Sequence, residues 1–330
     1  MKARTASRTT AGALTVLAVT GLLASLLLGP AATTPGDLRD FILHGDTTYA
    51  VIFIHLRLAR ACLAFLVGAA LALSGAVLQG FFRNPMADPF VVGVSSGASF
   101  GAVLVLVLGI RTGAGFAVQG SAAFISGLTV VGAVYVLSRR KGVFKVETLL
   151  LTGIAAGALA SSLTSFLLFM RADSFEQAVF WLLGSLASAD WNQAAAVAPL
   201  ILAGLAVAQA LARDMNLLSL GDDAALALGC PVGRIRTIFL VLATLLAALS
   251  VSVSGIIGFV GLIVPHWIRI LTGPDHRRLF LLSSFAGGVF LVYCDLLART
   301  VLAPAELPIG VITAAVGAPF FIYLLQRRRS

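Results

Sequence analysis

Nine stretches of the sequence contain no charged residue, and most of them are long enough to cross a bilayer. A helix needs about 20 apolar residues to span the roughly 30 Å hydrocarbon core. The windows are 11–29, 61–82, 89–110, 112–138, 148–170, 191–212, 237–268, 279–294 and 307–326. Only 11% of the residues are charged, against about 25% in an ordinary soluble domain. Because a bilayer offers backbone groups no water, this pattern predicts an all-α integral membrane protein.

The first window has two readings. It follows Lys2, Arg4 and Arg8, as the apolar core of a signal peptide would. It is also long enough to span, and no clear small-x-small cleavage site comes after it. We therefore expect a retained first helix.

The window 237–268 decides the number of spans. Its 32 residues are too many for one crossing, and Gly255 and Gly258 interrupt it. A reversal there gives ten transmembrane helices. An even number puts both basic termini in the cytoplasm, together with 17 of the 23 Lys and Arg residues. We expect one transmembrane domain over residues 1–330.

The net charge of +9 does not indicate a nucleic-acid-binding protein. The basic residues cluster between apolar runs, as in loops beside an anionic leaflet. Cys62, Cys230 and Cys294 are widely spaced, which favours core residues over a disulfide or a metal site. His266 lies near a predicted span end, where a structural residue and a ligand are both possible.

The segment 216–229, NLLSLGDDAALALG, lies between the predicted sixth and seventh spans, on the cytoplasmic side. It reads as two short helices, with Asp222 as an N-cap and Gly229 as a C-terminal stop. Its leucines would be poorly hidden in a free loop: Leu217, Leu218, Leu220, Leu226 and Leu228. They can contact another protein or rest on lipid headgroups, and the pattern leaves both open.

Four long motifs resemble a known family, the permease subunits of type II ATP-binding cassette (ABC) importers for iron-siderophores, haem and vitamin B12 (FecCD-like, BtuC-like). They are RLARACLAFLVGAALALSGAVLQGFFRNPMADPFVVGVSSGAS (57–99), LGDDAALALG (220–229), GFVGLIVPHWIRILTGPDHRR (258–278) and DLLARTVLAPAELPIGVITAAVGAPFFIYLL (295–325). The likeness runs along almost the whole chain and is weakest before residue 50 and over 100–145. One departure is Ala59, where the family usually has proline.

The resemblance implies ten helices in a homodimer, two ABC ATPase subunits on the cytoplasmic face and a substrate-binding protein outside. Segment 216–229 then corresponds to coupling helices that fit the ATPase. The residues implied are Leu218, Gly221, Asp222, Asp223, Ala225 and Gly229. The chain has no G-x-x-x-x-G-K-[ST] phosphate loop, so no cofactor is expected on it. ATP and Mg are expected on the ATPase, and the chain itself is not expected to be an enzyme.

The resemblance also implies roles for residues near the helix ends. Arg57, Arg60 and Arg299 would bind glutamates of the substrate-binding protein; the alternative is that they anchor in lipid headgroups. Asn84, Met86, Val146 and Glu147 would form a cytoplasmic gate; the alternative for RNPMADP (83–89) is a plain helix–helix turn.

The expected cargo is an iron chelate, either a ferric siderophore or haem, because FWLLGSLAS (180–188) resembles iron-chelate permeases. Vitamin B12 (cobalamin) is the alternative within the family. A self-sufficient secondary transporter is a further alternative, although ion coupling favours charges within the spans and the windows have almost none. A membrane-embedded assembly factor is another. The expected location is the bacterial plasma (inner) membrane, as a multi-pass protein with lipid around it.

Overall fold

The computed structural model describes residues 2–29, 33–44, 47–110, 115–140, 143–144 and 146–327. Most of these residues are helical, and a short antiparallel hairpin pairs β1 (Arg139–Arg140) with β2 (Val143–Phe144). The longer helices are α1 (Lys2–Leu27), α4 (Ala59–Phe81), α5 (Val94–Val107), α6 (Gly115–Ser138), α7 (Val146–Met170), α9 (Trp191–Ala210), α12 (Val232–Ser254), α13 (Val260–Thr272), α14 (His276–Thr300) and α15 (Ile309–Arg327). The shorter ones are α2 (Pro35–His44), α3 (Thr47–Ala50), α8 (Phe175–Leu182), α10 (Ala212–Leu218) and α11 (Asp222–Ala227).

The prediction of an all-α membrane protein is confirmed. In the described part of the chain, seven helices are long and apolar enough to cross a bilayer, and α5, α13 and α15 are shorter apolar helices. The total of ten spans stays a prediction. The window 237–268 divides into two helices, as predicted: α12 ends at Ser254 and α13 begins at Val260. Gly255 has a φ of 67°, and a Cβ there would overlap the carbonyl oxygen of Trp181.

Two helices extend beyond their charge-free windows. A π-helical segment, Val51–Leu58, leads directly into α4, and Ala59 is fully buried within this continuous helix. α14 runs on to Thr300. Both extensions carry buried charged residues that pair inside the protein, so the first charge did not mark the end of either helix.

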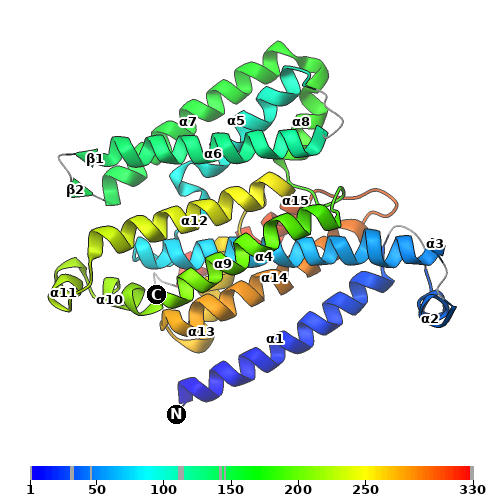
Figure 1. The fold of residues 1–330 in the computed structure, drawn as a ribbon, viewed down its shortest axis with the longest axis horizontal. Coiled ribbons are helices and arrows are strands. Elements are labelled where there is room, and N and C mark those ends of the chain that lie inside the picture. Colours follow the sequence, from blue (N-terminus) through cyan, green and yellow to red (C-terminus); the bar gives the residue numbers. More distant parts are fainter. Residues whose placement is uncertain are drawn as a thin grey trace.

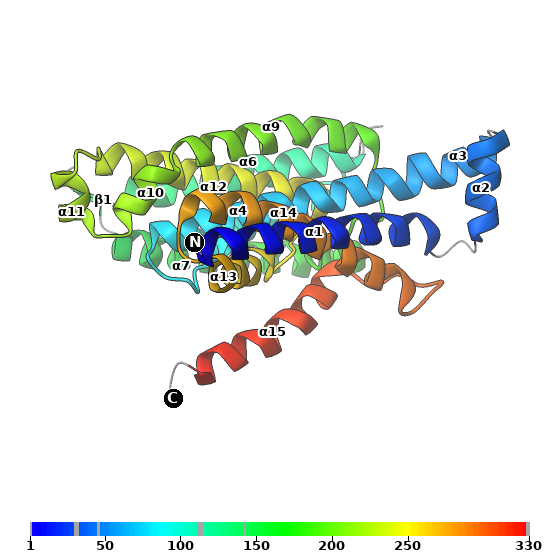
Figure 2. The same ribbon diagram turned by 90° about the horizontal axis from the view of Figure 1, so that it is seen from below.

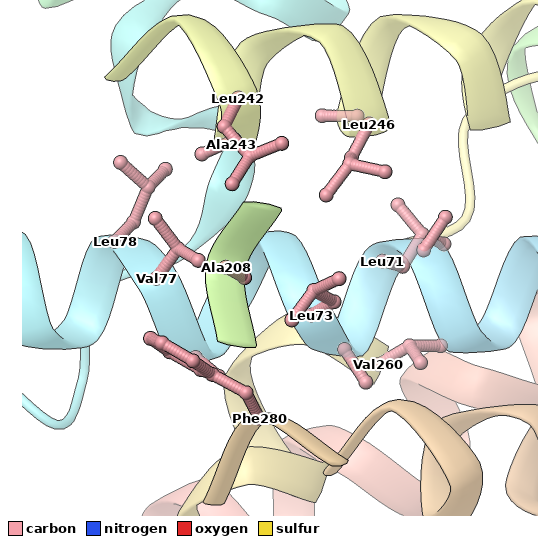
Figure 3. Packing of buried hydrophobic residues seen from close by; sticks show 14 of the residues in the cluster. Leu71, Leu73, Val77, Leu78, Ala208, Leu242, Ala243, Leu246, Val260 and Phe280 are labelled. Carbon is pink, nitrogen blue, oxygen red and sulfur yellow. The ribbon is translucent and has the colours of Figure 1, made fainter. Parts of the chain in front are cut away.

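Helix α4 occupies the centre of the bundle. It is buried along most of its length, whereas α1 and α7 expose most of theirs. Figure 3 shows the side chains that surround it from α9, α12, α13 and α14. Leu73 and Val77 of α4 contribute to the same cluster as Ala208 of α9, Leu242 and Leu246 of α12, Val260 of α13 and Phe280 of α14.

The two ends of the bundle differ. Helices α10 and α11 and the β1–β2 hairpin lie at one end, and α2, α3 and α8 lie at the other (Figure 1). We call these the α11 end and the α3 end. Helix α1 begins and α15 finishes toward the α11 end. Figure 2 shows α15 diverging from the other helices along its length.

Candidate coupling and docking sites

The segment 216–229 contributes to two short helices at the α11 end. α10 starts earlier than the predicted NLLSL helix, at Ala212, and α11 starts at Asp222. The N-cap of α11 is Gly221 and not Asp222, so that prediction is wrong. Gly221 adopts φ 116° and ψ 155°, a backbone region that is essentially open to glycine alone. The sharp reversal between the helices therefore needs this glycine.

Gly229 ends α11, as predicted. Its φ is 81°, its N–H donates to Leu226 O at 2.9 Å, and Cys230 N–H donates to Ala225 O at 2.9 Å. This pair of bonds is a Schellman motif, which satisfies the last carbonyls of the helix.

The leucines of the segment divide between two surroundings. Leu218 and the Ala225 methyl group are buried against the bundle. Leu220, Leu226 and Leu228 each expose more than half of their surface. The prediction that leucines are poorly hidden there is confirmed for these three. Exposed leucines beside acids form a surface typical of a protein contact.

Asp222 joins α11 to two other helices. Its Oδ1 accepts hydrogen bonds from the guanidinium of Arg83, at the end of α4, and from that of Arg236, on α12. The bond from Arg236 is 2.7 Å long. Arg236 is itself buried and stacks on the ring of Phe81, with 5.5 Å from Cζ to the centroid. One carboxylate thus connects α11 with the ends of α4 and α12.

Arg83 has an unusual backbone for a non-glycine residue, with φ 50°. It occupies the position after the α4 C-cap: Arg83 N–H donates to Gly80 O and Asn84 N–H donates to Gln79 O. A left-handed residue with a side chain costs about 1–2 kcal/mol. The same geometry directs the guanidinium toward Asp222. The sequence did not indicate this partnership, because the two residues are 139 positions apart.

A groove of about 780 Å³ opens beside this ion pair. It is lined by the end of α4, the start of α7 and the start of α11. Val146 and Glu147, two of the four predicted gate residues, line it together with Gly221, Asp222 and Asp223. The structure therefore brings half of the predicted gate next to the predicted coupling residues.

Asn84 and Met86 lie on the adjoining turn. Asn84 Oδ1 accepts a hydrogen bond from Met86 N–H at 3.0 Å, which closes the turn after α4. Asp88 is the N-cap of the short 3₁₀ helix Pro89–Val92, because its side chain accepts a bond from Phe90 N–H at 2.8 Å. Burial raises the pKa of Asp88 to about 6, although the Phe90 bond favours the ionised form. The gating role of the four residues stays a prediction.

Asn216 is a residue that the sequence reasoning missed. It lies on α10 and connects that helix with the start of α14. Its Oδ1 accepts from His276 N–H at 3.0 Å, and its Nδ2 donates to Asp275 Oδ1 at 2.8 Å. Burial acts to raise the pKa of Asp275, but the bonds from Asn216 and Arg277 N–H and the nearby arginines lower it overall. Nothing in the sequence of segment 216–229 predicts that Asn216 contacts the start of α14.

The three arginines of the predicted docking site lie near the α3 end of α4 and α14, and all three are buried. Arg60 Nε donates to Asp295 Oδ1 at 2.8 Å, and Arg60 NH1 lies 3.0 and 2.9 Å from the two carboxylate oxygens of Glu306. Opposite charges that share a buried site satisfy one another's hydrogen bonds. Neither acid was predicted as a partner of Arg60.

Arg57 and Arg299 bind the C-terminal end of α1. Arg57 NH1 donates to the carbonyls of Leu26 and Leu27 and to Thr33 Oγ1. Arg299 NH2 donates to the carbonyl of Ser25 at 2.8 Å and to its hydroxyl. The last carbonyls of a helix have no partner within the helix, and cations are favoured there. The two arginines therefore cap α1, and their docking role stays a prediction.

Other candidate chemistry is limited in the residues that the structure describes. No group of three or more His, Cys, Asp or Glu side chains there could hold a metal ion. Cys62, Cys230 and Cys294 are free thiols, and the last two are buried, as expected of core residues. His266 lies on α13 and is partly buried.

Comparison with known proteins gives one consistent result. Residues 16–327 match the model of the FecCD transport family. The cobalamin import system permease protein BtuC of Halobacterium salinarum is 46% identical over 287 residues, which cover 85% of this chain and 75% of that protein. The hemin transport system permease protein HmuU of Yersinia pestis is 40% identical, with 84% of each chain covered. A solved structure of a metal-chelate type ABC transporter, in an inward-facing conformation, has 32% identity and a TM-score of 0.86, and covers 97% of this chain and 99% of that one.

Proposed function

Because the chain belongs to the FecCD transport family, as a permease subunit of a type II ABC importer in the plasma membrane, we propose that it imports a large metal chelate. The first candidate is an iron chelate, a ferric siderophore or haem, delivered by a substrate-binding protein. The 40% identity to a hemin permease and the likeness to a metal-chelate transporter support this candidate. The second candidate is cobalamin, which the 46% identity to a cobalamin permease favours.

We further propose ten spans with both termini and the α11 end in the cytoplasm. The arrangement of the ends supports this: α1 begins and α15 finishes toward the end that carries α11 (Figure 1). That end also holds Arg83, Arg213, Arg236 and Arg277, and basic loops favour the cytoplasmic side. In this topology two copies of the chain form a homodimer, and the transported chelate passes along the interface between them.

The observation that carries the proposal is the surface of the α10–α11 pair. Leu220, Leu226 and Leu228 are exposed beside Asp222 and Asp223. The two helices are too short to cross a membrane, so lipid tails do not account for the exposure of these leucines. Such a surface suits a groove on a partner protein. We propose that each copy contacts one ABC ATPase subunit here, and that the ATPase binds ATP and Mg. The permease chain supplies no catalytic residue.

At the opposite end, Arg57, Arg60 and Arg299 are proposed to receive the substrate-binding protein. An arginine fork suits carboxylates because it can donate two parallel hydrogen bonds. Asn84, Met86, Val146 and Glu147 are proposed to gate the cytoplasmic opening, and the groove shared by Glu147 and Asp222 supports a link between gate and coupling helix.

Reconstituted vesicles test this function. Uptake of haem, a ferric siderophore and cobalamin is measured with the chain alone and then with the ATPase and the binding protein encoded beside it. ATP-dependent uptake of one chelate, only in the complete system, is the expected result and identifies the cargo. Uptake by the chain alone would instead indicate a secondary transporter, and no uptake with an assembled complex would favour an assembly factor.

The orientation has its own test. A cysteine introduced at position 223 is exposed to a membrane-impermeant thiol reagent in intact cells, with the native cysteines replaced by serine. We expect labelling only after the membrane is opened. Rapid labelling of intact cells would place the α11 end outside and overturn the topology.

A further inference from the structure

Arg60 is held by two carboxylates that differ in how firmly they are fixed. The side chain of Asp295, on α14, is 1% exposed and accepts from Arg60 Nε at 2.8 Å. The side chain of Glu306 is 28% exposed and belongs to the segment 301–308, which connects α14 with α15. Asp295 therefore belongs to the bundle interior, while Glu306 reaches Arg60 from a surface segment.

The other two arginines cannot be released as easily. Arg57 and Arg299 bind carbonyls at the end of α1, and Arg299 also lies 3.6 Å from Asp295. Removing either arginine would leave carbonyls at the end of α1 without partners in an apolar setting, which is unfavourable. A carboxylate that arrives from outside can displace Glu306 from Arg60 without uncapping α1.

The surroundings of Arg60 suit an additional anion. Among the residues that the structure describes, three guanidinium groups and two carboxylates meet there, so positive charge outnumbers negative charge by one. A cavity of about 260 Å³ is lined by all three arginines and by Glu306. The residues before Glu306 in its segment, 301–305, are exposed, so nothing in the described chain covers this side of the loop.

We propose that Glu306 is an internal substitute for a carboxylate of the docking protein. In the free permease Glu306 occupies Arg60; on docking, an acidic side chain of the substrate-binding protein takes its place. This inference rests on the proposed docking function and specifies its chemistry: the exchange at Arg60 is the step that discriminates the docked from the free state.

The segment that carries Glu306 keeps its backbone contacts when the side chain is released. Leu307 N–H donates to Ala298 O on α14 at 2.9 Å, Ile309 N–H donates to Gly184 O at 3.0 Å, and Gly310 N–H donates to Leu183 O at 3.0 Å. The exchange therefore involves the Glu306 side chain and does not require α14 or α15 to move.

The first test uses the chain alone in lipid nanodiscs. An arginine-selective dicarbonyl reagent is applied, and adducts are located by mass spectrometry in the wild type, Glu306→Ala and Glu306→Gln. The matched control is Glu176→Ala, which removes an exposed acid on α8 at the same end of the bundle. We expect labelling of Arg60 to rise at least about threefold in Glu306→Ala and less in Glu306→Gln, since the amide can still accept a bond.

Labelling of Arg57 and Arg299 should stay unchanged in all variants, because their partners on α1 remain. An unchanged rate at Arg60 in Glu306→Ala would overturn the proposal. A rise of equal size in the Glu176→Ala control would do the same, since it would indicate a general effect of charge.

The second test measures docking of the binding protein encoded beside this chain. We expect Glu306→Ala to lower the Kd by about 3- to 10-fold, because the internal competitor is gone, and Arg60→Ala to raise it. An unchanged or higher Kd in Glu306→Ala would contradict the exchange. Failure of the wild-type chain to bind that protein would refute the docking function, whereas the labelling result would still decide whether Glu306 masks Arg60.

Discussion

Arg236 on α12 donates a 2.7 Å hydrogen bond to Asp222, the first residue of α11. Because Arg236 is buried, and Asp222 is partly exposed, a surface helix is fastened to a residue inside the bundle. Arg83 at the end of α4 donates to the same carboxylate oxygen. A displacement of α11 by a partner must therefore either move α4 and α12 with it or break these bonds.

Replacing Asp222 with Asn should impair coupling more than stability. The Asp222 side chain is 44% exposed, and the amide oxygen of Asn can still accept from Arg83 and Arg236, so the Tm of the purified chain should fall only slightly. Loss of the charged partner should weaken the attachment of α11 by about 1 kcal/mol, a roughly fivefold change in the equilibrium between attached and detached α11. We therefore expect less ATP-dependent uptake for each ATP hydrolysed. The measurement is the ratio of uptake to hydrolysis in vesicles.

Asp223→Asn is the matched control for that variant, because it removes the same charge from the adjacent, exposed position. Equal losses in the two variants would show that the acidic surface matters and the connection to Arg236 does not.

Gly221→Ala should disturb the reversal between α10 and α11. The added Cβ meets open space, so the cost comes from the backbone region alone and should be on the order of 1–3 kcal/mol. We expect weaker co-purification of the ATPase with this variant. Gly233→Ala is the comparison, since Gly233 is exposed, has open space around it and lies within the helix α12. Full ATPase recovery with Gly221→Ala would mean that α11 tolerates another entry angle.

The sequence was a good guide wherever a local signal decides the structure. The apolar windows predicted the long helices, Gly255 marked the end of α12, and Gly229 marked the end of α11. A spanning helix must be apolar to enter lipid, and a left-handed backbone position favours glycine. Both constraints can be read from neighbouring residues.

The failures arose where distant residues compensate one another. The charges of Arg60 and Asp295 seemed to limit α4 and α14, yet they pair across 235 positions and lie within longer helices. The assignment of Asp222 as an N-cap failed for a related reason, because its carboxylate serves Arg83 and Arg236 instead of the helix amides. No pattern within a single segment reveals such pairs.

The contact between α4 and α14 should be sensitive to a single methyl group. A Cβ at Gly68 would overlap the carbonyl oxygen of Gly287 and approach Leu291 Cβ to 2.7 Å. Small residues allow helices to approach closely in membranes, and overpacking costs typically about 1–3 kcal/mol. We expect Gly68→Ala to lower the free energy of unfolding by that amount, measured by denaturation in mild detergent.

Gly132→Ala on α6 is the control for Gly68→Ala, because nothing lies within 4 Å of a Cβ at that position. It should be neutral or slightly stabilising, since alanine has the higher helix propensity. A Gly68→Ala variant as stable as Gly132→Ala would mean that α14 can shift away from α4 at little cost.

Asp88 should make the stability of the turn after α4 depend on pH. Its pKa in the folded protein is about 6, against 3.8 for an ordinary aspartate, so the folded state binds more protons between these values. The free energy of unfolding should therefore decrease as pH rises from about 4 to about 6, by about 2–3 kcal/mol in total, and level off above pH 6. Asp88→Asn should remove most of this slope, because asparagine keeps the acceptor for Phe90 N–H but does not titrate. Unfolding curves collected from pH 4.5 to 7.5 measure the effect. Asp223→Asn is the control: it removes an exposed acid at the same end of the bundle and should retain the wild-type slope. A slope that persists in Asp88→Asn would assign the pH dependence to other groups.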